Sequence, residues 1–309
     1  MQPLRKRITA IIFILAIAGL LATKIQLDLT TDNFVDNWLY DMTLAQNAWL
    51  SDPPEIDTNS NVIVVALDEK TTYAKEFEKY GWTAAAPKFA TLIHALSKNG
   101  VQRIGFDYVF AHPDDFLVEN HEIEFLQELV KNRKIIVLGR MKMLNVAPRF
   151  FAAVGGQTRI GSLDTKTDTD NVLRRIPLTI WTKTNEGSSI GIPSFISILT
   201  ENIRPKTDKR DSVILAPRNH LQAIPTYSFI DILRCHETGN GHLLSEVFTG
   251  KIVLVGTTLS GVDRKTSADR FIRRPATIVA SDSLSRTQCT LVPRSVANPK
   301  SRTIPGVYA

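Results

Sequence analysis

Residues 61–68 read NVIVVALD, a continuous apolar run of strand length that ends on an aspartate. Val and Ile are branched at Cβ and favour extended backbone. The apolar residues do not alternate with polar ones, so both faces of this strand are expected to be covered. Strands of this kind are typical of a parallel sheet that packs between other layers.

The pattern continues toward the C-terminus as a strand–helix–strand unit. Apolar residues recur at helical spacing between Pro87 and Gly100, and residues 101–110 (VQRIGFDYVF) then read as a second strand. Further helices are expected near 34–49, 119–132, 193–202 and 228–234, and further strands at 134–138 and 251–256. This alternation indicates an α/β domain with a mainly parallel sheet and flanking helices.

One stretch departs from the alternation. Residues 160–182 read as two extended arms on either side of residues 167–171 (TDTDN). Asn171 suits the left-handed backbone of a tight turn. We therefore expect one β-hairpin over this stretch.

An uncharged apolar run precedes the domain. Residues 8–23 (ITAIIFILAIAGLLAT) follow a basic triplet at 5–7. Their length approaches the ~20 residues that cross a bilayer as a helix, and basic flanks stay cytoplasmic. We expect residues 8–24 to be a single transmembrane helix in contact with lipid, with residues 1–7 cytoplasmic and residues 25–309 outside. A cleaved signal peptide is the alternative, although leucines stand where cleavage favours small side chains.

The net charge of +6 is unevenly distributed. Residues 264–303 are basic and rich in Ser, Thr and Pro, without clear periodicity, which predicts a loop-like insertion. This segment has a single aromatic residue, Phe271, whereas a surface that binds nucleic acid interleaves basic and stacking aromatic residues. We expect no nucleic-acid partner. The two cysteines, Cys235 and Cys289, are either a disulfide pair or unrelated thiols.

Polar residues stand at or just beyond the ends of several predicted strands. Since the carboxyl ends of parallel strands meet at one edge of a sheet, these residues are expected to line a crevice for a small ligand. The candidate binding residues, which include two from loops above that edge, are Asp68, Trp82, Asp107, Asp114, Thr257 and Thr258. The alternative is that the Asp and Thr side chains cap the loops and helices that follow them.

No catalytic motif has its expected context. Residues 187–191 (GSSIG) match the G-x-S-x-G pattern of serine hydrolases, with Asp231, His236 and His242 downstream. That pattern requires a core strand directly before the serine, and the polar residues 183–186 stand there instead. We expect a chain without catalytic activity; the alternative is a membrane-anchored exported hydrolase that uses Ser189.

Signatures of metal and cofactor binding are also missing from the sequence. Asp164, Asp168 and Asp170 are close enough together to suggest a calcium loop, but neither register supplies the glycine at the sixth position or the glutamate at the twelfth. Phosphate-loop, zinc and dinucleotide motifs are absent. We therefore expect no metal and no cofactor.

The chain resembles the second class of CHASE domains, the extracytoplasmic sensor modules of bacterial receptors. The resemblance rests, in chain order, on DNWLYD at 36–41, VIVVALDE at 62–69, GW at 81–82, LSKNG at 96–100, IGFDYVF at 104–110, DTDNVLR at 168–174, PS at 193–194, SFIDIL at 228–233, GKIVLVGTT at 250–258 and PGV at 305–307. These stretches span most of residues 36–309.

The resemblance implies a one-helix anchor in the bacterial inner membrane and an exported α/β sensor, followed by more membrane helices and a cytoplasmic cyclase or kinase. It implies no site residues. The chain differs in its longer, more basic segment near 266–303, and it stops after PGV without a second membrane run. We expect the sensory input of a receptor whose effector is missing from this chain. It would bind an unknown extracytoplasmic ligand and work as a homodimer or with a full-length partner.

Overall fold

The computed structural model describes residues 34–50, 55–78, 86–111, 121–183, 188–201, 212–214, 222–259, 266–267, 291 and 293. Its helices are α2 (Phe34–Trp49), α3 (Glu69–Thr72), α4 (Lys75–Glu78), α5 (Ala86–Lys98), α6 (His121–Lys131), α7 (Pro148–Ala153), α8 (Phe195–Thr200), α9 (Phe229–Glu237) and α10 (Gly241–Phe248), with a 3-10 turn, η1 (Gln157–Arg159). Its strands are β1 (Glu55–Ile56), β2 (Val62–Leu67), β3 (Arg103–Phe106), β4 (Ile136–Arg140), β5 (Ile160–Ser162), β6 (Val172–Leu173), β7 (Arg175–Pro177), β8 (Thr179–Lys183), β9 (Ser189–Pro193), β10 (Ser212–Ile214), β11 (Gln222–Ala223), β12 (Thr226–Ser228), β13 (Ile252–Thr257) and β14 (Thr266–Ser267).

A six-stranded parallel sheet forms the centre of the molecule, in the order β12-β2-β13-β3-β4-β5. The apolar run that predicts the fold is β2, which pairs with β13 from Val62–Ile252 to Leu67–Thr257. Side chains on the central strands are fully buried, including Val65, Val253 and Val255. The predicted α/β class and mainly parallel sheet with flanking helices are confirmed.

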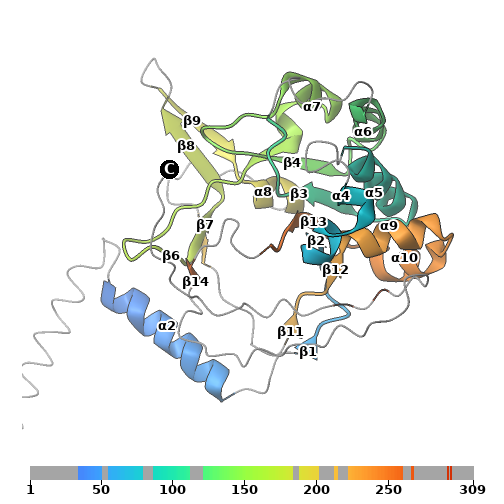
Figure 1. The fold of residues 1–309 in the computed structure, drawn as a ribbon. Helices are drawn as coiled ribbons and strands as arrows, with labels where there is room; N and C mark the ends of the chain where they lie inside the picture. Colours follow the sequence, from blue (N-terminus) through green and yellow to red (C-terminus); the bar gives the residue numbers. More distant parts are fainter. Residues whose placement is uncertain are drawn as a thin grey trace, which may run out of the picture.

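The helices follow from how the strands are connected. The connections β2–β3, β3–β4, β4–β5 and β12–β13 all advance in the same direction across the sheet. Right-handed crossovers in one direction place their helices on one face, and α5, α6, α7, α9 and α10 pack together there over the main core (Figure 1). The other face carries α8, whose Phe195 and Leu199 pack against Val137.

The end of α5 shows how local sequence fixes an element. Gly100 has φ of 72°, a backbone conformation that favours glycine. Its N–H donates to Ser97 O (3.2 Å), and the N–H of Val101 donates to Leu96 O (3.4 Å). This pair of bonds is the Schellman motif, which closes the helix and turns the chain into β3.

The prediction of a hairpin over residues 160–182 is wrong about which residues form it. The turn itself forms, with Asn171 at φ of 60°, but the two arms do not pair with each other. β5 instead pairs in parallel with β4, and β6 pairs in parallel with β14. The hairpin of this region consists of β8 and β9, antiparallel from Thr179–Pro193 to Lys183–Ser189. Of the polar residues 183–186 only Lys183 is described, and it is the last residue of β8.

Several sequence predictions fall largely outside the described residues. The expected anchor at 8–24 is among them, and no helix in the described part of the chain is long and apolar enough to cross a membrane. Of the basic segment 264–303, only Thr266–Ser267 and two single residues are described. Cys235 is fully buried on α9 and takes part in a disulfide, whereas Cys289 lies outside the described residues.

Candidate functional site

The carboxyl edge of the sheet brings four of the six candidate residues together. β12, β2, β13 and β3 are neighbours in that order, and all four end at the same edge because they are parallel. Asp68 follows β2, Thr257 ends β13 and is followed by Thr258, and Asp107 follows β3. Trp82 and Asp114, the two loop candidates, lie outside the described residues.

Asp68 is a helix cap. Its Oδ1 atom accepts hydrogen bonds from the N–H of Thr71 (2.9 Å), from the Thr71 hydroxyl (2.8 Å) and from the hydroxyl of Ser228 (2.8 Å). The first bond satisfies a backbone donor that the start of α3 leaves open, and the bond from Ser228 ties α3 to the end of β12. Asp68 therefore caps α3, as the capping alternative expects.

Thr257 and Thr258 also join neighbouring strand ends. The Thr257 hydroxyl donates to Leu67 O (3.3 Å) and accepts from the N–H of Leu259 (3.3 Å). The N–H of Thr258 donates to the same carbonyl of Leu67 (3.2 Å). These bonds extend the β2–β13 pairing past the ends of the strands and fix the geometry of the edge.

Asp107 is the exposed carboxylate of this edge. Its backbone N–H donates to Val255 O (2.9 Å), which holds the residue in register with β13. Next to it, burial and the charge of Asp107 raise the pKa of the Tyr108 phenol, although the neighbouring Thr257 hydroxyl opposes the shift. The oxygen of this phenol is itself buried. The edge thus combines an exposed carboxylate with two threonine hydroxyls, groups that can form hydrogen bonds with a small polar ligand.

The hydrolase motif does not assemble. Ser189 begins β9, an antiparallel hairpin strand, and α8 starts only at Phe195, so the strand–serine–helix turn of a nucleophile elbow is not formed. Asp231 lies on α9, where the ammonium of Lys70 donates to it at 2.5 Å. The described residues include no cluster of His, Cys, Asp and Glu that could hold a metal ion.

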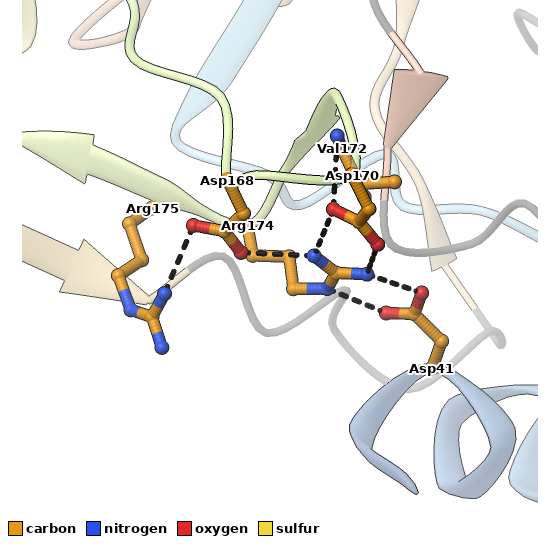
Figure 2. A network of polar contacts seen from close by, with 6 residues as sticks. All are labelled: Asp41, Asp168, Asp170, Val172, Arg174 and Arg175. Atoms are coloured by element: carbon orange, nitrogen blue, oxygen red, sulfur yellow. Dashed lines mark hydrogen bonds and ion pairs between the residues drawn. The ribbon is translucent and has the colours of Figure 1, made fainter. Parts of the chain in front are cut away.

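A second polar site, which the sequence analysis does not single out, centres on Arg174 (Figure 2). Arg174 lies between β6 and β7 and is 2% exposed. Its guanidinium binds the carboxylates of Asp41 on α2 and of Asp168 and Asp170 in the turn before β6. Hydrogen bonds to Asp170 and Asp41 raise its pKa above the ordinary value, although burial opposes this, so it remains charged at any working pH.

A family model, the CHASE2 domain, matches residues 11–285. The chain belongs to the CHASE2 family. Members of this family are sensor domains of the second CHASE class, so the resemblance seen in the sequence is confirmed. No curated protein and no solved structure matches this chain.

Both polar sites of this CHASE2 domain lie inside the matched range. The strand-end residues could be found because each one directly follows an apolar run. Asp41 and Arg174 each fall in a stretch that carries the family resemblance, but 133 positions separate them in the chain. Local spacing gives no sign of such a pairing; the available signal was three aspartates and two arginines within residues 164–175, too many charges for a simple turn.

Proposed function

We propose that this CHASE2 chain is the extracytoplasmic sensory domain of a bacterial membrane receptor, which passes ligand binding to a cytoplasmic cyclase or kinase. The observation that carries the proposal is the CHASE2 match over residues 11–285. The match takes in most of the apolar run at 8–23 together with the α/β domain. In this proposal residues 8–24 anchor the chain, residues 1–7 are cytoplasmic and residues 25–309 lie outside.

Two features of the chain support this orientation. The basic triplet at 5–7 directly precedes the apolar run, and such residues stay on the cytoplasmic side. The disulfide of Cys235 is of a kind that persists in oxidising compartments and is rare in the cytosol. The two features are independent, since one depends on charge near a membrane and the other on redox chemistry.

Reporter fusions test the orientation. Alkaline phosphatase fused after Ala309 should be active, and a fluorescent protein that folds only in the cytoplasm should be dark at the same position. The opposite pair of results would contradict the proposed topology. N-terminal sequencing of the membrane fraction would separately reveal cleavage after the apolar run, which would remove the anchor and leave the export intact.

The proposed ligand site is the carboxyl edge near Asp68, Asp107, Thr257 and Thr258, with Trp82 and Asp114 from the loops above it. Asp68 also caps α3 at this edge, since its Oδ1 atom accepts hydrogen bonds from Thr71 and Ser228. A ligand that binds only the folded domain raises its melting temperature. A thermal-shift screen of small polar metabolites and ions should therefore yield hits that Asp107→Asn weakens. Hits that keep their full affinity in Asp107→Asn would place the ligand elsewhere.

A receptor of this kind changes the cell when its ligand favours one of two states that differ on the cytoplasmic side. We propose that the chain pairs as a homodimer or with a full-length partner to do so. Cross-linking in intact membranes should capture a dimer. A chain that remains monomeric in membranes, both with and without a ligand found in the thermal-shift screen, would contradict the pairing.

A further inference from the structure

The guanidinium of Arg174 has all of its hydrogen-bonding capacity in use. Nε and Nη2 donate to the two oxygens of Asp41 (2.9 and 2.7 Å), in the bidentate geometry that Arg forms best. Nη1 and Nη2 donate to the two oxygens of Asp170 (2.9 and 2.7 Å), and Nη1 also donates to Asp168 (2.9 Å). An arginine has five N–H groups, and these bonds use every one of them.

Most of this arrangement is local in sequence. Asp168 and Asp170 precede Arg174 by six and four residues, and the turn that holds them is closed by backbone bonds from Asn171 N–H to Asp168 O and from Asp168 N–H to Val172 O, both 2.9 Å. Arg175 donates to the second oxygen of Asp168 (3.0 Å). The turn and the two arginines thus make a socket whose own bonds lie entirely within residues 168–175. Asp41 enters it from 133 residues away (Figure 2).

The charges favour a reversible contact. Asp168, Asp170, Arg174 and Arg175 balance one another, so the socket is neutral without α2. The carboxylate of Asp41 adds one net negative charge and gives up its hydration, being 0% exposed. Because desolvation offsets much of the attraction in a buried ion pair, the docked state gains only modest free energy.

Among the side chains of α2 that the structure describes, at residues 36–46, the buried ones are Asn37, Asp41 and Ala45, spaced four apart along one stripe. Two of the three are polar, so this part of the stripe adds little apolar stabilisation. Neither hydrophobic cluster of the described residues includes Ala45. The Nδ2 atom of Asn37 is buried without a hydrogen-bond partner in the described part of the chain, which further weakens docking. The large apolar side chains Trp38 and Leu39 are instead 41% and 50% exposed.

We infer that α2 is a detachable helix with a docked and a released state, and that the contact between Asp41 and Arg174 sets the balance between them. In the released state Asp41 is hydrated and Arg174 keeps its bonds to Asp168 and Asp170, so neither charge is left buried and unpaired. The next step rests on the proposed function, in which the apolar run is the membrane anchor and α2 lies between this anchor and the sheet. Its release would therefore change the link between the sensor and the membrane.

Hydrogen exchange of the full chain in detergent micelles tests this inference. Asp41→Asn keeps the shape of the side chain and removes its charge, so the amides of α2 should exchange faster by at least about tenfold, equivalent to ~1.4 kcal/mol. Amides of β2 and β13 should keep their wild-type rates. Asp36→Asn is the matched control, because it makes the same change at an exposed position of the same helix. It should leave α2 unchanged.

Two results would overturn the inference. Unchanged exchange of α2 in Asp41→Asn would show that the ion pair does not hold the helix. Loss of protection in α2 and in the sheet together, or a variant that fails to fold, would show that α2 is an inseparable part of the domain. Arg174→Lys keeps the positive charge and loses the bidentate geometry, so it should give a smaller increase confined to α2. Hydrogen exchange of α2 does not depend on the orientation of the chain in the membrane. The reporter fusions could therefore contradict the proposed topology without affecting the inference about α2.

Discussion

Asp68 and Asp107 follow two strands that flank β13 and differ in what surrounds their carboxylates. Asp68 accepts three hydrogen bonds within the domain, whereas the side chain of Asp107 is exposed. The two residues have the same type and the same position relative to a strand. What differs is the element that follows: α3 begins directly after Asp68, and its open N–H groups recruit the carboxylate.

This difference predicts unequal effects on stability. Asp68→Ala removes a helix cap and leaves the hydroxyl of Ser228 without this acceptor, so the free energy of unfolding should fall by about 1–2 kcal/mol. Asp107→Ala changes an exposed side chain and should shift it by no more than about 0.5 kcal/mol. Urea unfolding of both variants measures the two values. Equal losses would contradict the assignment of Asp68 as the cap.

His236 makes a second residue-scale prediction, on pH. Burial, the neighbouring His94 (ring centroids 5.5 Å apart) and Lys98 lower the pKa of His236 below its ordinary 6.5, although Glu237 opposes them. Between the lowered pKa and 6.5 the unfolded chain binds more protons than the folded one, so stability decreases as the pH falls through about 6.5.

Thermal unfolding at pH 7.5 and pH 5.5 measures this dependence. The wild-type domain should lose more stability on acidification than His236→Gln, which has no proton to take up at this position. His242→Gln removes an exposed imidazole and serves as the control, with the wild-type dependence. A His236→Gln variant that is as sensitive to acid as the wild type would rule out this linkage.

The elements show which part of a fold is readable from local sequence. β2 and α5 were predicted because burial on both faces and helical spacing leave a pattern within a few residues. The turn at 167–171 was also readable, and Asn171 adopts the expected backbone. Its arms were not, because the partner of β5 is β4 and the partner of β6 is β14. Strand pairing between distant segments leaves no local signal, and the same reason hid the contact between Asp41 and Arg174.

The approach of α8 to the sheet gives an element-scale prediction. A Cβ atom on Gly161 of β5 would lie 2.7 Å from the backbone N of Phe195, too close to be tolerated without a shift of backbone. Gly161→Ala should therefore destabilise the domain by about 1–3 kcal/mol, as overpacking does. Gly241→Ala, at the start of α10, meets no atom closer than 3.9 Å and should be neutral or slightly stabilising. Chemical denaturation measures the free energy of unfolding of both variants. Equal values for Gly161→Ala and Gly241→Ala would contradict the close approach of α8 to β5.

At the scale of the whole molecule, the disulfide and the core are linked. Cys235 is 0% exposed and belongs to the main hydrophobic cluster, so the bond is anchored in the interior. The sequence has one other cysteine, Cys289, so an intramolecular disulfide can only join these two. Such a bond restricts the unfolded chain over the intervening loop and stabilises the fold mainly for that reason.

The prediction concerns thiols and stability together. Protein made in an oxidising compartment should react with no alkylating reagent before reduction and with two equivalents after reduction and unfolding. Cys235→Ser and Cys289→Ser should each lose about 2–5 kcal/mol, and the double variant should lose no more than either single one. A free thiol in the oxidised wild-type protein would contradict the pairing.

The strand order has a consequence for biosynthesis. β12–β2 on one side and β3–β4–β5 on the other are joined only through β13, which is the last of the six strands to leave the ribosome. A nascent chain shorter than Thr257 therefore has two unjoined apolar edges in place of a sheet, and non-local pairing of this kind makes folding slow. In the proposed export of this domain, a chain that cannot complete its sheet before β13 is made would stay unfolded enough to pass through a narrow translocation channel.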